Sequence, residues 1–255
     1  MAQNIQLLVG EKTYIHGSFS RPVEDSTVDR DSLLILMAHG FPGDKNGHEK
    51  LYLDLEFLLR DKGFHTLRFD FRGCGESEGR EEEFTFSSAC EDFKAVLRWA
   101  KEKNYTRFVY IGEGLGATVT LMNGNTDVTC YILLWPVMDP AQDIRLNFGV
   151  DTLDEGAKRN GYTVHYDHRI GLPFLKEMAK LNIALTLKDI KAPVLVMHGA
   201  RDAVVPIEQL EILRTHIGSR RVEITSFHDG SHGLPSLTHR KTLYYHVKQF
   251  IEKYT

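Results

Sequence analysis

The stretch RFVYIGEGLGAT, residues 107–118, decides how this chain folds. Residues 107–111 form a short, largely apolar run that is typical of a buried strand, and residues 115–123 are typical of a short helix. Between them lie glycines at positions 112, 114 and 116, which allow the backbone to turn sharply where side chains would crowd it. The stretch therefore predicts a strand that passes abruptly into a helix.

The same alternation of strand and helix extends outward in both directions. The run at 33–38 is apolar throughout, as in strands that are covered on both faces of a parallel sheet. Toward the N-terminus the pattern predicts a hairpin within residues 1–20, strands at 33–38 and 65–71, and helices at 47–62 and 87–103. Toward the C-terminus it predicts strands at 129–135, 192–198 and 221–227, and helices at 207–217 and 238–253. We therefore expect an α/β protein with a mostly parallel central sheet and helices on both faces.

Residues 141–191 interrupt this alternation. They carry mixed charges and several glycines, and they lack a long apolar strand. Length alone would allow the 255 residues to form one large domain or two small ones. Because the strand and helix pattern resumes after residue 191, we expect residues 1–255 to form a single domain in which 141–191 is an insertion above the sheet.

Composition and charge exclude several classes of protein. Hydrophobic residues make up 42% and charged residues 26% of the chain, which is an ordinary globular balance. The net charge of −4 argues against a broad nucleic-acid surface. The apolar runs at 33–38 and 130–135 are much shorter than the ~20 residues that a membrane span needs. The N-terminus does not resemble a signal peptide, and cysteines at positions 74, 90 and 130 form no spaced framework, so we expect reduced thiols and a cytoplasmic location.

Four loops that follow predicted strands carry the residues most suited to chemistry. In open α/β sheets, ligands bind beyond the carboxyl ends of the strands, so these loops are expected to meet. They read HGFPG at 39–43, GEGLGA at 112–117, HGARD at 198–202 and HDGSHG at 228–233. Each loop alone has an ordinary interpretation as a tight turn or a cap. Together, they place a carboxylate, Asp202, where it can orient an imidazole, either His232 or the competing His228.

The chain order of glycine-rich turn, aspartate and histidine is the order found in α/β-hydrolases, whose nucleophile elbow reads G-x-S-x-G. With HGF at 39–41 and FDFRGCGES at 69–77, these loops make the chain resemble a serine esterase or lipase. The resemblance extends over about residues 10–253 and is nearest the monoacylglycerol-lipase and cinnamoyl or feruloyl-esterase branch.

The resemblance implies a role for each matching residue. Gly114 occupies the nucleophile position, His232 matches the general base and Asp202 the residue that orients it. The backbone N–H groups of Phe41 and Leu115 match the oxyanion hole. Trp135 and Pro136 would face the acyl pocket, and residues 141–191 would form a cap with four candidate pocket aromatics, Phe148, Tyr162, Tyr166 and Phe174. Core or cap packing is an equally good interpretation of Trp135 and the four cap aromatics.

Gly114 departs from the family pattern, because acyl transfer needs a hydroxyl at this position. Removing the nucleophile from a serine hydrolase lowers kcat by about a million-fold, or about 8 kcal/mol. We therefore expect the chain to bind ester-like ligands and turn them over very slowly. Three explanations stay open: an engineered Ser→Gly replacement, a natural pseudoenzyme, or another nucleophile such as Cys74 or Ser77. The intact Asp202 and His232 favour the first.

A second class of function also fits part of the turn. The spacing of Gly112, Gly114 and Ala117 satisfies the dinucleotide pattern G-x-G-x-x-A, but no acidic residue ends the next predicted strand. An oxidoreductase is therefore the remote alternative. No metal cluster is evident, since His165 and His168 have no matching ligands nearby in sequence. We expect a small-molecule acyl ester as the partner and no cofactor, metal, nucleic acid or membrane span; the sequence does not indicate an oligomeric state.

Overall fold

A computed structural model describes residues 2–10, 12–23, 32–124, 127–148 and 155–255. In this part of the chain, eight strands form one sheet in the order β1-β2-β4-β3-β5-β6-β9-β10. The strands are β1 (Ala2–Val9), β2 (Thr13–Ser20), β3 (Leu33–Ala38), β4 (His65–Phe69), β5 (Arg107–Glu113), β6 (Val128–Leu134), β9 (Val194–Gly199) and β10 (Val222–Phe227). Only the pairs β1–β2 and β2–β4 are antiparallel, so the sheet is mainly parallel, as predicted.

Helices cover both faces of the sheet, and the alternation of side chains along β3 explains why. Leu33, Ile35 and Met37 belong to a buried cluster with α1 (Leu51–Arg60) and α9 (Leu237–Tyr254). Leu34, Leu36 and Ala38 point to the other face, where they belong to a cluster with α2 (Phe86–Glu102), α3 (Leu115–Met122) and α8 (Leu210–His216). All six side chains are buried, which accounts for the continuous apolar run. The predicted α/β class is confirmed.

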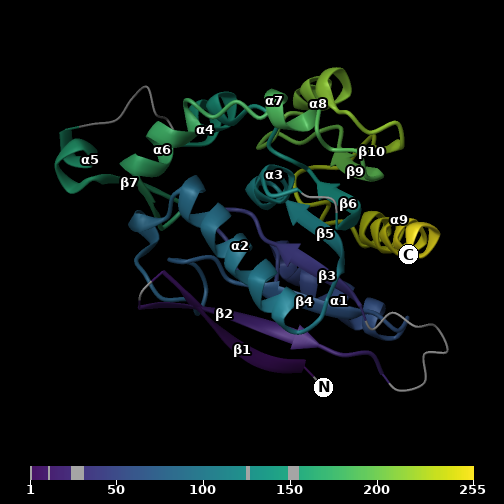
Figure 1. The fold of residues 1–255 in the computed structure, drawn as a ribbon. Helices are drawn as coiled ribbons and strands as arrows, with labels where there is room; N and C mark the ends of the chain where they lie inside the picture. The colour runs from purple at the N-terminus through teal and green to yellow at the C-terminus, as the bar shows by residue number, and fades with distance from the viewer. Residues whose placement is uncertain (1, 11, 24–31, 125–126, 149–154) are drawn as a thin grey trace.

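The segment between β6 and β9 has a different character from the rest of the chain. It contains α4 (Pro140–Phe148), α5 (Glu155–Asn160), β7 (Tyr162–His165), β8 (His168–Gly171), α6 (Leu172–Met178) and α7 (Ala184–Leu187). Figure 1 shows α4, α6 and α7 in a row across the top of the view, with α5 and β7 at one end. β7 and β8 form a two-stranded antiparallel hairpin, apart from the main sheet. Residues 149–154 of the predicted insertion lie outside the described residues.

Acidic residues of the sheet domain hold this hairpin. The short helix Glu81–Glu83 provides two of them. Glu81 contacts the His168 ring and accepts a hydrogen bond of 2.7 Å from the Arg169 amide, and Glu82 Oε1 lies 3.7 Å from Arg169 Nη1. A Cβ on Gly171 would collide with the Glu82 carbonyl oxygen, so the two backbones are in direct contact. His165 and His168 face each other across the hairpin, and His168 is paired with Glu81.

The boundaries of most predicted elements agree with the structure to within a few residues. The largest difference is the predicted helix at 47–62, whose α-helical part begins only at Leu51. A short 3-10 helix, His48–Lys50, precedes it, and Glu49 and Lys50 have left-handed backbone conformations that stop the α-helix from extending backward. The strand predicted at 65–71 ends at Phe69, whereas β5 runs two residues further than predicted and ends at Glu113.

Cys74, Cys90 and Cys130 are all free thiols. None of the helices in the described part of the chain is both long and apolar enough to cross a bilayer.

Candidate active site

The turn between β5 and α3 has the geometry of a nucleophile elbow. Gly114 lies at its apex with φ 53° and ψ −120°, and α3 begins at the next residue. The glycines on either side are required by packing: a Cβ on Gly112 would lie 2.5 Å from the Ala117 Cα, and one on Gly116 would collide with the Ala38 carbonyl oxygen. Close approach of α3 to β5 and β3 therefore explains these two glycines without any nucleotide.

Gly114 differs from both neighbouring glycines in the space around it. Among the residues that the structure describes, a Cβ built on Gly114 meets only the Gly40 Cα, at the ordinary contact distance of 3.8 Å. A side chain at this position would fit. Its only energetic cost would come from the positive φ, which residues other than glycine rarely adopt. The elbow thus has room for the serine that the family pattern requires, although the chain carries a glycine there.

The loop after β3, residues 39–47, lies against this apex. The Nε2 atom of His39 accepts a hydrogen bond of 3.1 Å from the Phe71 amide, and its Nδ1 contacts the Gly40 carbonyl oxygen at 2.6 Å. Nε2 therefore carries no proton, and burial lowers the pKa of His39 in the same sense, so the ring bridges Phe71 and Gly40 and positions the loop. Within the described residues, no protein atom accepts a hydrogen bond from the Phe41 amide, which leaves this N–H available to a ligand. Leu115 is the first residue of α3, where backbone N–H groups have no partner within the helix.

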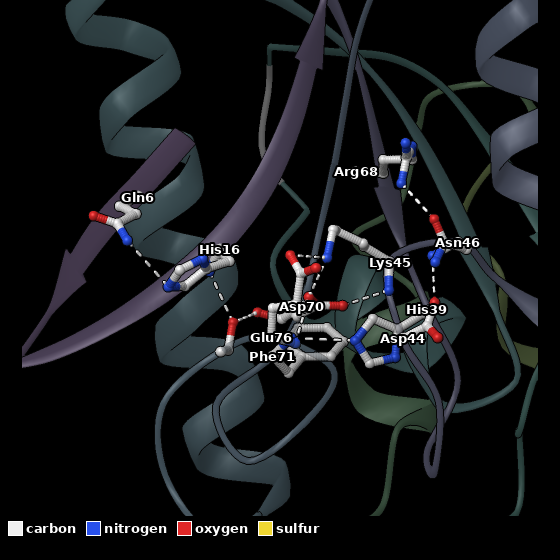
Figure 2. Close-up of polar contacts among 11 residues, drawn as sticks. Gln6, His16, His39, Asp44, Lys45, Asn46, Arg68, Asp70, Phe71 and Glu76 are labelled. Carbon is white, nitrogen blue, oxygen red and sulfur yellow. Dashed lines mark hydrogen bonds and ion pairs between the residues drawn. The ribbon is translucent and has the colours of Figure 1, made fainter. Parts of the chain in front are cut away.

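A buried ion pair fixes the far side of this loop (Figure 2). Lys45 donates to Asp70 from its backbone amide at 2.6 Å and from its Nζ at 2.7 Å, and its Nζ also contacts Glu76 at 2.8 Å. Asp70 is fully buried, and a Cβ on Gly75 would collide with its carboxylate. The 69–77 motif is therefore a support for the 39–47 loop, because its acidic residues hold Lys45.

The acid and base predicted from sequence are brought together beyond β9 and β10. His232 Nδ1 lies 2.9 Å from Asp202 Oδ2 and 3.1 Å from Oδ1, while the competing His228 is exposed. The amides of Val204 and Val205 each donate to Asp202 Oδ1 at 2.9 Å. These donors fix the carboxylate, which in turn orients the His232 ring with Nδ1 toward it.

Electrostatics keep Asp202 ionised. Burial alone would raise its pKa, but hydrogen bonds from His198, His232 and the Val205 amide hold the pKa well below its usual range. His198 is fully buried and also contacts the Val205 carbonyl oxygen at 2.8 Å. These hydrogen bonds therefore favour the ionised form of Asp202 beside His232.

Two rings pack against His232. The Trp135 ring packs edge-on to His232, with ring centroids 5.9 Å apart, and the His48 ring lies 5.7 Å from the same imidazole. Trp135 is 1% exposed and Pro136 is also buried. Trp135 thus packs against the predicted base and within the core, and the pocket role of both residues stays a prediction.

A second aromatic cluster joins the 39–47 loop to the segment between β6 and β9. The Phe41 ring is stacked on the Phe84 ring, with ring centroids 3.9 Å apart. The centroid of the Phe174 ring lies 4.9 Å from that of Phe41. Phe148 lies 6.1 Å from Phe174. Of the other aromatics predicted for this segment, Tyr162 packs under the Arg169 guanidinium, and Tyr166 is 86% exposed at the hairpin tip.

Sequence reasoning missed two buried carboxyl groups near His232. Glu113 ends β5 and is 4% exposed, and Asp143 on α4 is 7% exposed. Burial raises the pKa of each to about 7, and the nearby charge of His232 opposes both shifts. A charged residue at the end of an apolar strand, next to the predicted nucleophile position, was a visible signal for Glu113; the sequence around Asp143 offers none.

The alternative nucleophiles are poorly suited to the role. Cys74 is buried, and burial together with Asp70 raises the pKa of its thiol well above the usual range. Ser77 donates its hydroxyl to the Asp70 carbonyl oxygen at 2.7 Å and accepts a bond from the His16 amide at 2.8 Å. Ser77 therefore belongs to the support beneath the 39–47 loop, and the Cys74 thiol is buried and hard to ionise.

Comparison with known proteins agrees with the observed fold. A family model described as alpha/beta hydrolase fold matches residues 34–134. The chain is 28% identical over 188 residues to the lysophosphatidylserine lipase ABHD12 of Danio rerio. The aligned region covers 69% of this chain and 44% of that relative. The chain thus spans less than half the length of this lipase.

Solved structures match almost the whole chain. Est1E from Butyrivibrio proteoclasticus, in a structure with bound ferulic acid, superposes with a TM-score of 0.83 at 18% identity and covers 98% of both chains. Mouse alpha/beta hydrolase domain-containing protein 10 gives a TM-score of 0.78 at 20% identity, covering 99% of this chain and 100% of that one. The chain therefore has the α/β-hydrolase fold, and a lipase and several esterases are among the proteins to which it is similar.

Proposed function

We propose that this chain is a carboxylic ester hydrolase scaffold of the serine type, in which Gly114 occupies the nucleophile position and limits turnover. The observation that carries the proposal is the hydrogen-bonded pair of His232 and Asp202, 2.9 Å apart, with an elbow on the same sheet whose apex has room for a side chain. All the parallel strands involved end at one edge of the sheet, where ligands bind in such folds.

The proposed roles follow the chemistry of acyl transfer. A hydroxyl at position 114 would attack the ester carbonyl carbon, and His232 would take its proton and pass it to the departing alcohol. The N–H groups of Phe41 and Leu115 would stabilise the oxyanion. Gly114 has no atom that can form the acyl-enzyme, so only binding and oxyanion stabilisation remain. Together they can sustain a rate of roughly 10³ to 10⁴ times that in water.

The proposed substrate is a small ester with an apolar or aromatic acyl group. The support for this class is the cluster of Phe41, Phe84 and Phe174, which joins the proposed oxyanion loop to the 141–191 segment. We propose that this segment acts as the cap that shapes specificity. Ferulic acid, bound in the Est1E structure, is an aromatic acid of this kind.

Two origins of Gly114 are proposed, and each has support. The intact Asp202 and His232 pair favours a replacement of serine in an active esterase. The φ of 53° favours the alternative, a natural pseudoenzyme that binds esters without turnover, because glycine adopts this conformation without strain. Reading codon 114 in the source gene separates the two.

The test of the proposed function is to place a hydroxyl at the elbow. We expect Gly114→Ser to hydrolyse p-nitrophenyl acetate or butyrate at least about 10³-fold faster than the present chain, since a missing nucleophile costs about 10⁶ in kcat. Gly114→Ala is the matched control, because it adds the same Cβ at the same positive φ without a nucleophile. A folded Gly114→Ser protein that is no faster than Gly114→Ala on any p-nitrophenyl ester would refute the proposal.

A further inference from the structure

Glu113 is buried beside the elbow, yet the catalytic roles proposed above do not use it. It is the last residue of β5, is 4% exposed and directly precedes Gly114. Carboxylates are almost never fully buried unless hydrogen bonds or opposite charges compensate them, because removal from water is costly. The contacts of this side chain therefore indicate what it does.

The Glu113 carboxylate accepts hydrogen bonds from two backbone amides of the loop after β3. The His48 amide donates at 3.0 Å to Oε1 and at 3.2 Å to Oε2, and the Gly40 amide donates to Oε1 over a longer distance of 3.4 Å. These amides lie at the two ends of the loop that contains Phe41. One carboxylate oxygen thus connects both ends of the loop to the residue before Gly114.

The first of these ends lies where displacement matters most. The Gly40 Cα is 3.8 Å from the place that a Cβ on Gly114 occupies, and Gly40 immediately precedes Phe41. A shift of Gly40 would therefore move the Phe41 N–H relative to the reacting carbonyl. The Lys45 and Asp70 pair holds the middle of the loop independently. The His39 ring, bonded to the Phe71 amide, also holds the start of the loop, and Arg240 Nη2 donates to the His48 carbonyl oxygen at 3.1 Å. Without Glu113, these attachments would remain, and the Gly40 and His48 amides would lose the acceptor that they share.

We infer that Glu113 is a positioning residue. It holds the 39–47 loop and the adjoining His48 against the elbow, and so places the Phe41 N–H for oxyanion stabilisation. Its catalytic consequence rests on the proposed ester hydrolase function, whereas its effect on the loop does not. Glu113 acts through the backbone of Gly40 and His48, and it does not itself touch substrate.

The experiment compares two replacements of Glu113. Glu113→Gln keeps an oxygen at Oε1 that can accept from both amides, whereas Glu113→Met keeps the side-chain length and removes the acceptor. Hydrogen exchange, followed by mass spectrometry on peptides that span residues 39–48, reports the loop directly. Asp143→Asn is the matched control, because Asp143 is also buried with a pKa of about 7 but bonds to Asn147 on its own helix.

We expect Glu113→Met to exchange these amides about 10-fold faster than the parent, and Glu113→Gln and Asp143→Asn to match the parent. In the Gly114→Ser background, Glu113→Met should lower kcat by about 10- to 100-fold with little change in KM, since oxyanion donors act in the transition state. Glu113→Gln should restore most of kcat.

Parent-like exchange in folded Glu113→Met, or equal acceleration in Asp143→Asn, would overturn the inference. An inactive Gly114→Ser protein with faster loop exchange in Glu113→Met would instead contradict the proposed function and leave the positioning role intact.

Discussion

The two halves of the candidate site differ in the groups that they contain. In the acid and base half, Asp202 is fixed by the amides of Val204 and Val205 and is hydrogen-bonded to His232. In the elbow half, the backbone keeps the turn at Gly114 and the support from Glu113, but no side chain projects from the apex. The comparison teaches that backbone packing alone can build a turn of this shape, because no reactive atom is present at its apex.

The largest expected effect tests whether the two halves work together. In the Gly114→Ser background, we expect His232→Ala to lower kcat/KM on p-nitrophenyl butyrate by about 10⁴- to 10⁶-fold, since the base and nucleophile of such sites act as a unit. The variant His228→Ala, which alters the exposed competitor of His232, should leave kcat/KM within about twofold. If His232→Ala lowered kcat/KM by less than tenfold, the two halves would not act together, which would contradict the proposed roles.

Differences among the elbow glycines should appear next in stability. Gly116→Ala would drive its Cβ into the Ala38 and His39 carbonyl oxygens and should cost more than about 3 kcal/mol or prevent folding. Gly114→Ala meets no close atom and carries only the strain of its φ of 53°, about 1–3 kcal/mol. Urea denaturation of both variants checks the order, and an equal cost would show that Gly114 is held by packing after all.

The two halves should also respond to pH in opposite directions. Burial raises the pKa of Glu113 from 4.5 to about 7, so its contribution to stability is full below pH 4.5 and is lost as pH rises through 7. Relative to Glu113→Gln, the parent should lose on the order of 3 kcal/mol of unfolding free energy between pH 4.5 and 8. The titratable and charged groups near Glu113 are the same in both proteins; they include Tyr52, His48, His232 and Arg240.

The contribution of Asp202 to stability changes with pH in the opposite direction. Its hydrogen bonds hold its pKa below the ordinary 3.8, so its contribution is present above about pH 4 and is lost on acidification. The difference in unfolding free energy between the parent and Asp202→Asn should therefore shrink as pH falls below 4. Parallel pH curves for the Glu113 and Asp202 variants would contradict the assigned environments.

Much of this architecture could be predicted from sequence, for reasons that particular residues make clear. The apolar run of β3 and the glycines at 112 and 116 each reflect a local constraint, burial on both faces or close backbone approach, that a single chain displays directly. The pairing of Asp202 with His232 could be anticipated only through the order of the motifs, because the two residues are 30 positions apart.

Other features depend on contacts that leave no local pattern. Asp143 lies where α4 meets the loop of Asp202, and there Asn147 donates to both Asp143 and the Val204 carbonyl oxygen. The docking of the β7–β8 hairpin on Glu81 is equally non-local. Even the late start of α1 arises from left-handed Glu49 and Lys50, which the apolar periodicity of that helix does not reveal.

The most direct test of the central claim is covalent labelling of the elbow. A fluorophosphonate reacts with a serine hydroxyl that an adjacent imidazole activates, and intact-protein mass spectrometry counts the adduct. Gly114→Ser should gain one adduct, mapped to residue 114, whereas the present chain, Gly114→Ala and the double variant Gly114→Ser/His232→Ala should gain none. An unlabelled but folded Gly114→Ser protein, or an equal adduct on the present chain, would show that Gly114 does not occupy a nucleophile position.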